Sequence, residues 1–148
     1  MAFVLDASIT ACWAFQDEDH PDASLAFDQT GTGGAVVPCL WWFEVRNILV
    51  VNERRQRIAE SDTATFLLNL SRLRIRVDRA PDECAVLRLA RTHRLSVYDA
   101  AYLELAQREG LPLATLDADL QKAAAGEKIA LLSRRATGQL HHRSRKGT

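Results

Sequence analysis

The sequence predicts an α/β fold with one domain, in which a parallel sheet of about five short strands is flanked by helices. Short apolar runs alternate along the chain with longer segments that have helical periodicity. The runs are continuously apolar, as is typical of parallel strands that are buried on both faces. The length of 148 residues fits one domain that buries a core of its own.

The expected elements follow from these runs and from the turn residues between them. The apolar runs expected to form strands are residues 2–5, 35–37, 75–77, 113–115 and 129–131. The segments expected to form helices are residues 9–14, 22–30, 40–57, 61–73, 81–94, 97–109 and 119–125. We expect the domain to span residues 1–132, and we expect the polar, basic segment 133–148 to be disordered.

The formal net charge of zero conceals an uneven distribution. Residues 1–127 contain 13 basic and 19 acidic residues, whereas residues 128–148 contain 6 basic residues and no acidic one. A basic segment on an acidic body can bind nucleic acid or an acidic partner. It can equally be a solubilising end, and the sequence leaves both interpretations open.

Two further features exclude several classes of protein. No apolar run approaches the ~18 residues that span a bilayer, and no signal peptide is visible, so we expect a cytoplasmic protein. The spacing of Cys12, Cys39 and Cys84 suits neither a zinc site nor a disulfide framework. We expect these three residues to be small, reduced members of the core.

Four carboxylates in apolar surroundings indicate the chemistry. Asp6 and Asp117 directly follow expected strands, and ligands of open parallel sheets bind beyond that edge. Glu44 and Asp99 lie on the apolar stripes of expected helices, Glu44 together with Leu40, Ile48 and Val51. Four converging carboxylates repel one another unless a divalent cation lies between them. The pattern therefore predicts a magnesium-type site, and phosphodiester hydrolysis as its reaction.

Each acid also has an ordinary structural explanation. Asp6 can be a helix N-cap, and Asp99 can belong to a capping box with Ser96. Glu44 can pair with a cation, of which Arg46 is the nearest in sequence, or accept a hydrogen bond from Asn47. Only the joint pattern of four acids without matched cations favours the metal site.

Four segments resemble the successive motifs of PIN-domain nucleases, and more narrowly those of VapC-type toxins from type II toxin–antitoxin pairs. They are Val4-Leu5-Asp6-Ala7-Ser8, Glu44-Val45-Arg46-Asn47-Ile48-Leu49, the segment from Ser96 to Ala106 and the segment from Pro112 to Asp117. The resemblance covers roughly residues 2–132. The basic segment that follows matches none of these motifs.

The resemblance implies a fold, an activity and a site. It implies an endoribonuclease that depends on Mg²⁺ or Mn²⁺ and leaves 5′-phosphate and 3′-hydroxyl ends. It also implies a cognate antitoxin protein as partner, and a homodimer. The implied catalytic and metal-binding residues are Asp6, Glu44, Asp99 and Asp117, and the implied supporting positions are Ser8, Asn47 and Thr115. Asp119 is either a further supporting carboxylate or a solvated acid in the first turn of its helix.

An acidic body repels RNA, so basic residues elsewhere must hold this substrate. The candidates in the basic segment are Arg134, Arg135, Arg143, Arg145 and Lys146. Arg54, Arg55 and Arg57 are further candidates, or simply the solvated end of a helix.

Two other functions remain open. One is a PIN-fold binding module without catalysis. The other is a phosphoacceptor signalling domain with an acidic pocket. A receiver-like domain needs paired acids at the end of its first strand, but here Ala7 and Ser8 follow Asp6.

Overall fold

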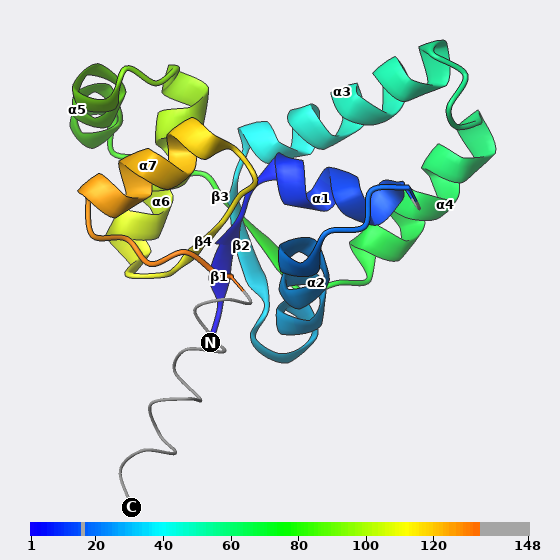
Figure 1. Cartoon of the computed structure of the whole chain (residues 1–148), viewed down its shortest axis with the longest axis horizontal. Helices are drawn as coiled ribbons and strands as arrows, with labels where there is room; N and C mark the ends of the chain where they lie inside the picture. Colours follow the sequence, from blue (N-terminus) through cyan, green and yellow to red (C-terminus); the bar gives the residue numbers. More distant parts are fainter. Residues whose placement is uncertain (16, 134–148) are drawn as a thin grey trace, which may run out of the picture.

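The computed structural model describes residues 1–15 and 17–133, and in it a layer of four parallel strands lies between two groups of helices (Figure 1). The predicted α/β class with a parallel sheet is therefore confirmed. The elements in chain order are β1 (Phe3–Leu5), α1 (Ala7–Ala14), α2 (Pro21–Gly33), β2 (Ala35–Pro38), α3 (Leu40–Arg54), α4 (Glu60–Ser71), β3 (Ile75–Asp78), α5 (Glu83–His93), α6 (Val97–Glu109), β4 (Leu113–Ala114) and α7 (Ala118–Gly126).

The strand order in the sheet is β3-β2-β1-β4, so the first strand of the chain lies in the interior of the sheet. Phe3 pairs with Ala35 of β2, and Leu5 pairs with Ala114 of β4. All residues of β1, β2 and β4 are buried, which explains why these segments are apolar without alternation. β3 is an edge strand and is only partly buried.

The fifth predicted strand is reduced to a single bridge. Leu131 pairs with Leu113 in parallel orientation, and the Leu132 N–H donates to the Leu113 carbonyl at 2.9 Å. The apolar run at 129–131 thus extends the sheet beyond β4 by one residue pair only. The described part of the chain ends at Ser133, two residues after this bridge. The rest of the basic segment, for which we expect disorder, and the five candidate RNA-binding residues in it therefore lie outside the described residues.

Several helix boundaries differ from the prediction. α1 already begins at Ala7, and α3 ends at Arg54 because Gln56 adopts a left-handed conformation with φ 58°. α2 continues through two glycines to Gly33 and stops at Gly34, whose φ of 78° is accessible to glycine without strain. The predicted cap of α6 is confirmed, because the Ser96 hydroxyl accepts a hydrogen bond from the Asp99 N–H at 3.0 Å.

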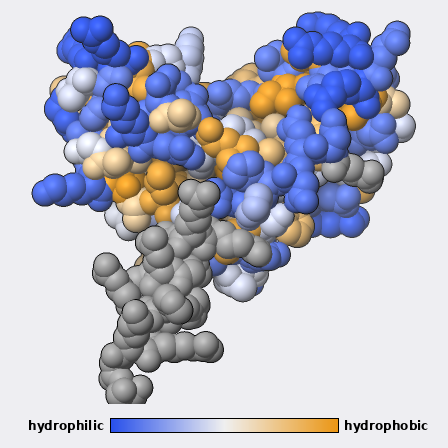
Figure 2. Space-filling view, in the orientation of Figure 1, coloured by the Kyte–Doolittle hydropathy of each residue, from blue (hydrophilic) through white to orange (hydrophobic). Residues whose placement is uncertain are grey.

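The helices divide between the two faces of the sheet. Figure 1 shows α1 to α4 on one side of the strands and α5 to α7 on the other. α6 contacts β1, β2 and β4 and also α5 and α7, so it forms the centre of its layer. On the opposite side α1 packs against α2 and α3. The space-filling view shows separate hydrophobic patches between hydrophilic regions at α5 and at the far end of α3 (Figure 2).

Two expectations about buried residues need correction. Cys39 and Cys84 are exposed and are not core residues, whereas Cys12 is half-buried and packs against the core. The buried stripe of α3 consists of Trp41, Val45, Leu49 and Asn52, not of the neighbouring stripe that contains Glu44. Both stripes are apolar in sequence, and contact with α1 and β2 selects one of them. No helix within the described ranges combines the length and the apolar character needed to cross a membrane.

Candidate active site

Four carboxylates, which we name the acid cluster, belong to the elements that meet at the carboxyl edge of the sheet. Asp6 follows β1 and Asp117 follows β4 after two further residues, and these strands are neighbours. Glu44 lies in the second turn of α3, which begins directly after β2, and Asp99 lies in the first turn of α6. Parallel pairing of β1, β2 and β4 brings the three strand ends to one edge.

Asp6 is buried and is held by two hydroxyl groups. Its Oδ2 accepts hydrogen bonds from Ser8 Oγ at 2.7 Å and from Thr115 Oγ1 at 2.6 Å. Asp6 occupies the N-cap position of α1, yet its side chain makes no capping hydrogen bond there. The capping explanation therefore does not account for this carboxylate.

The same two hydroxyls connect Asp6 to the segment that carries Asp117. Ser8 Oγ accepts from the Leu116 N–H at 3.0 Å, and Thr115 Oγ1 accepts from the Asp117 N–H at 3.1 Å. Each hydroxyl thus donates to Asp6 and accepts from the backbone beyond β4. The predicted supporting positions Ser8 and Thr115 hold the acids of two adjacent strands in a fixed relation.

Glu44 is half-buried and pairs with a residue that the sequence analysis did not assign to the site. The hydroxyl of Tyr102, a fully buried residue of α6, donates to Glu44 Oε1 at 2.6 Å. Arg46, the cation nearest to Glu44 in sequence, instead donates to the Trp42 carbonyl at 3.0 Å and stacks on the Trp42 ring. Asn47 is exposed, and its predicted contact with Glu44 is not formed among the described residues.

The side chain of Asp117 caps a helix, whereas Asp99 takes part in a helix cap through its backbone N–H and not through its carboxylate. Asp117 Oδ1 accepts the Leu120 N–H at 3.0 Å and caps α7. The cap of α6 uses the Asp99 N–H and the Ser96 hydroxyl. Asp119, in the first turn of α7, is exposed, and its charge adds to the field at Asp99.

The electrostatics show that the acids lie within range of one another. Burial raises the pKa of Asp6 against the hydrogen bonds from Thr115 and Ser8, and the charge of Asp117 raises it further. Burial raises the pKa of Glu44 against the Tyr102 hydrogen bond, and the charges of Asp6 and Asp99 add to this. Burial also raises the pKa of Asp99, as do the charges of Asp117 and Asp6. Each shift includes repulsion from another member of the cluster.

No lysine, arginine or histidine forms an ion pair with the acid cluster among residues 1–15 and 17–133. The nearest cation in sequence to Glu44, Arg46, is engaged elsewhere. The negative charge of the cluster is therefore not balanced by the described side chains. This is the property expected of a site that binds a cation.

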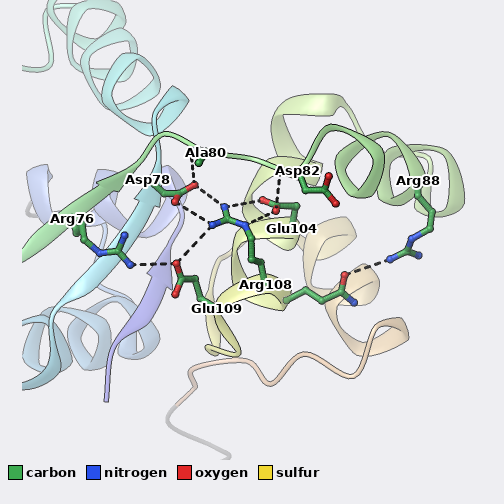
Figure 3. A network of polar contacts seen from close by, with 9 residues as sticks. Arg76, Asp78, Ala80, Asp82, Arg88, Glu104, Arg108 and Glu109 are labelled. Atoms are coloured by element: carbon green, nitrogen blue, oxygen red, sulfur yellow. Dashed lines mark hydrogen bonds and ion pairs between the residues drawn. The ribbon is translucent and has the colours of Figure 1, made fainter.

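A further acid at a strand end shows the opposite arrangement. Asp78 ends β3, and Arg108 donates to it through Nη2 at 2.7 Å and through Nη1 at 3.2 Å (Figure 3). Hydrogen bonding to Arg108 lowers the pKa of Asp78, although burial by itself would raise it. Arg108 also pairs with Glu104, which is 2% exposed. Where this fold uses a buried carboxylate for structure, it supplies an arginine, in contrast to the acid cluster.

The donor set fits a hard divalent cation, although the described side chains do not form a ready-made cage. No three acidic, histidine or cysteine side chains of the described residues lie close enough together to hold one ion. Mg²⁺ prefers oxygen ligands and usually keeps several waters while it binds to one or two carboxylates. Oxygen donors spaced around an open edge satisfy this requirement, and those available are Asp6, Glu44, Asp99 and Asp117.

Two groups of charged residues away from this site have structural contacts: one is a predicted candidate for RNA contact, and the other was not predicted. Arg57, a candidate for RNA contact, bonds to Asp17 at 3.0 Å and to Asn52 at 2.8 Å. It therefore ties the end of α3 to the loop after α1. Sequence reasoning missed the network of Asp78, Glu104 and Arg108, although the i, i+4 spacing of the last two signals a pair.

Comparison with known proteins agrees with the fold. PAE2754 from Pyrobaculum aerophilum has a similar structure, with a TM-score of 0.64 and 26% identity over 83% of this chain and 87% of that one. FitAcB from Neisseria gonorrhoeae shares the fold at 17% identity, with a TM-score of 0.57 over 90% of this chain and 97% of the other. The search of curated proteins found no match. The PIN domain model matches residues 3–126, and the protein therefore belongs to the PIN domain family, whose members are generally nucleases.

Proposed function

We propose that this protein is a metal-dependent endoribonuclease and the toxin of a VapC-type toxin–antitoxin pair. One observation carries the catalytic part of the proposal. The charges of Asp6, Asp99 and Asp117 each raise the pKa of another acid in the cluster, and no described cation forms an ion pair with any of the four. Membership of a generally nucleolytic family makes phosphodiester hydrolysis the reaction that such a site supports best.

The residues of the chain have distinct tasks in this reaction. When bound, Mg²⁺ or Mn²⁺ supplies Lewis acidity that activates a water and stabilises charge on the phosphoryl oxygens. Asp6, Glu44, Asp99 and Asp117 are the residues that would hold it. Ser8 and Thr115 fix the orientation of the Asp6 carboxylate, since both donate to its Oδ2.

The products follow from the bond that breaks. A water oxygen forms a bond to phosphorus, the bond from phosphorus to the 3′ oxygen breaks, and the 3′ oxygen takes up a proton. The ends are a 5′-phosphate and a 3′-hydroxyl. The attacking water gives up its proton to a carboxylate of the acid cluster, and burial and neighbouring charges, which raise the pKa of these carboxyls, make it a stronger base than a free carboxylate.

RNA must approach an acidic body, so basic side chains have to attract it. We propose Arg134, Arg135, Arg143, Arg145 and Lys146 for this role on the basis of sequence alone. Removal of residues 134–148 should weaken RNA binding and flatten its dependence on salt, and cleavage at saturating RNA should persist. An antitoxin partner and a homodimer, both supported by the motif resemblance, complete the proposal together with the cytoplasmic location expected from the sequence.

The decisive experiment is cleavage of a 5′-labelled single-stranded RNA in the presence of Mg²⁺ or Mn²⁺. Asp6→Asn and Asp99→Asn should each reduce the rate at least a hundredfold, because each removes a charge that the cation requires. Removal of divalent cations with EDTA should abolish cleavage by the wild type. The matched control is Asp82→Asn, an exposed aspartate that also occupies an N-cap without a side-chain capping bond.

Three outcomes are informative. Cleavage that survives both substitutions in folded protein rejects the assigned residues. Cleavage that continues in EDTA rejects the metal dependence. RNA binding by the wild type without cleavage under any of these conditions favours the alternative of a binding module.

A further inference from the structure

The hydroxyl of Tyr102 holds one member of the acid cluster across the interior of the fold. It donates to Glu44 Oε1 at 2.6 Å, which is short for a bond between oxygens and typical of a charged acceptor. Tyr102 is 0% exposed, so its ring cannot move without disturbing the layer that α6 forms. The hydrogen bond therefore ties a half-buried carboxylate to a rigid point.

The position of Tyr102 on α6 gives this bond its significance. Tyr102 follows Asp99 by three residues, so both project from the same face of the helix. α6 thus contributes one acid directly and fixes a second acid that belongs to α3. Because α6 also contacts β1, which leads into Asp6, it sets the relation between three members of the cluster.

Glu44 needs such an anchor more than the aspartates do. A glutamate side chain has three rotatable bonds, and the charges of Asp6 and Asp99 repel its carboxylate. Asp6 is held by Ser8 and Thr115, but among the described residues the only side-chain hydrogen bond to Glu44 comes from Tyr102. Without this bond the repulsion favours conformations in which the Glu44 carboxylate moves away from the site.

We infer that Tyr102 is a positioning residue, which holds the Glu44 carboxylate in place for the cation of the proposed nuclease site. The inference rests on the proposed function, since it assumes that the acid cluster binds Mg²⁺ or Mn²⁺. Groups that orient a metal ligand typically change metal affinity by about 10- to 100-fold when they are removed. A buried tyrosine hydroxyl also needs a partner for purely structural reasons, so the test must separate the two roles.

The test compares Tyr102→Phe with the wild type in the full-length chain. Mn²⁺ affinity is measured without RNA, from the rise in Tm with Mn²⁺ concentration and from calorimetric titration. We expect at least tenfold weaker Mn²⁺ binding by Tyr102→Phe. The matched control is Tyr98→Phe, which removes the same hydroxyl from an exposed tyrosine of the same helix and should leave the affinity unchanged.

The RNA cleavage assay supplies a second readout. Tyr102→Phe should raise the Mn²⁺ concentration needed for half-maximal cleavage, and cleavage at saturating Mn²⁺ should largely recover. A purely structural role instead lowers the Tm of the metal-free protein and leaves the Mn²⁺ affinity of the folded fraction unchanged. That result, or an affinity within twofold of the wild type, overturns the inference.

A measurement on the wild-type sequence covers the case in which Tyr102→Phe does not fold. The chain contains two tyrosines, so incorporation of 3-fluorotyrosine yields two ¹⁹F signals. Titration with Mg²⁺ should shift the Tyr102 signal over the same range in which the Tm rises. A Tyr102 signal that stays constant through that range contradicts the inference while the proposed function stands. A wild type that binds neither Mg²⁺ nor Mn²⁺ rejects the proposed function and this inference together.

Discussion

At the scale of single residues, the environment decides what a carboxylate does. Asp6, Asp78 and Asp117 all lie at or just beyond the carboxyl ends of parallel strands. Asp78 is neutralised by Arg108, Asp117 caps a helix through one oxygen, and Asp6 is buried with two hydroxyls and no cation. The same residue type thus has a structural role in the first case and a candidate catalytic role in the last.

The raised pKa of Glu44 leads to a prediction about stability. When the pKa of a carboxyl is higher in the folded than in the unfolded state, the protein is more stable with this group protonated than with it ionised. This contribution is lost as pH rises from the unfolded value of about 4.3 through the folded value. Glu44→Gln removes the charge and keeps an oxygen for Tyr102. We expect it to stabilise the metal-free protein at pH 7 by about 0.5–2 kcal/mol.

The measurement is thermal unfolding in EDTA between pH 4 and pH 8. The gain from Glu44→Gln should shrink as pH falls toward 4, where Glu44 becomes protonated. Glu83→Gln, at an exposed position in the first turn of α5, is the control and should change stability by less than about 0.5 kcal/mol. Destabilisation by Glu44→Gln at neutral pH would mean that the Glu44 charge is compensated in the folded protein.

At the scale of secondary structure elements, α6 combines core packing, the candidate site and an ion-pair network. Its buried residues include Ala100, Leu103 and Leu105, its first turn carries Asp99, and its last turns carry Glu104 and Arg108. Arg108 also reaches Asp78 at the end of β3, the edge strand farthest from β4 (Figure 3). The network therefore fastens the central helix of one layer to the outermost strand.

Removal of the arginine should be costly, because Glu104 is 2% exposed and would be left buried without its ion-pair partner. We expect Arg108→Met to destabilise the protein by about 3 kcal/mol, at the lower end of the range for a broken buried pair because Arg108 itself is partly exposed. Urea unfolding at pH 7 measures this.

The control is Arg76→Met, which removes an exposed arginine that pairs with Glu109 at 3.5 Å and should cost no more than about 1 kcal/mol.

The pairing of Arg108 with Asp78 should also make this stabilisation depend on pH. Because Arg108 lowers the pKa of Asp78, the stabilisation from this pair is present above the unfolded pKa of Asp78 and is lost as pH falls through the folded value. The difference between Arg108→Met and the wild type should therefore decrease in acid. Equal effects of both substitutions would show that the network contributes no more than a surface pair.

At the scale of the whole molecule, the charge distribution is uneven, and we expect it to couple folding to the proposed cation binding. The body of the chain, residues 1–127, has six more acidic than basic residues, and the acid cluster concentrates part of that charge at one edge of the sheet. Folding therefore assembles repulsion, which a cation at the proposed site would relieve. Metal binding and stability should be coupled, since a ligand that binds only the folded state stabilises it.

We expect Mn²⁺ at about 100 times its Kd to stabilise the protein by about 2.7 kcal/mol, which raises the Tm by several degrees. The acids must be deprotonated to bind it, and burial and mutual repulsion raise the pKa of Asp6, Glu44 and Asp99. The Mn²⁺ effect should accordingly decline as pH falls through these raised values. Melting curves with and without Mn²⁺ at several pH values provide the measurement. A Tm that Mn²⁺ leaves unchanged at pH 8 would contradict the coupling.

Much of the fold could be predicted because it depends on local patterns. The apolar runs located all four strands, and the Ser96 cap was visible in the sequence. The stripe that α3 buries could not be predicted, because two adjacent stripes are apolar and only contact with α1 and β2 selects between them. The exposure of Cys39 and Cys84 could not be predicted for a similar reason. Apolar neighbours in sequence do not determine whether a side chain faces the core or the solvent.

The sequence by itself determined the α/β class and the order of the elements, and it indicated four candidate acids, because strand ends and helix stripes follow from local periodicity. Tertiary structure alone decided how acids pair with residues that lie far away in sequence. The hydroxyls of Ser8 and Thr115 meet at Asp6 across 107 residues of sequence, and Tyr102 reaches Glu44 across 58. Hydrogen bonds over such separations depend on how the sheet and helices pack, and no local pattern encodes them.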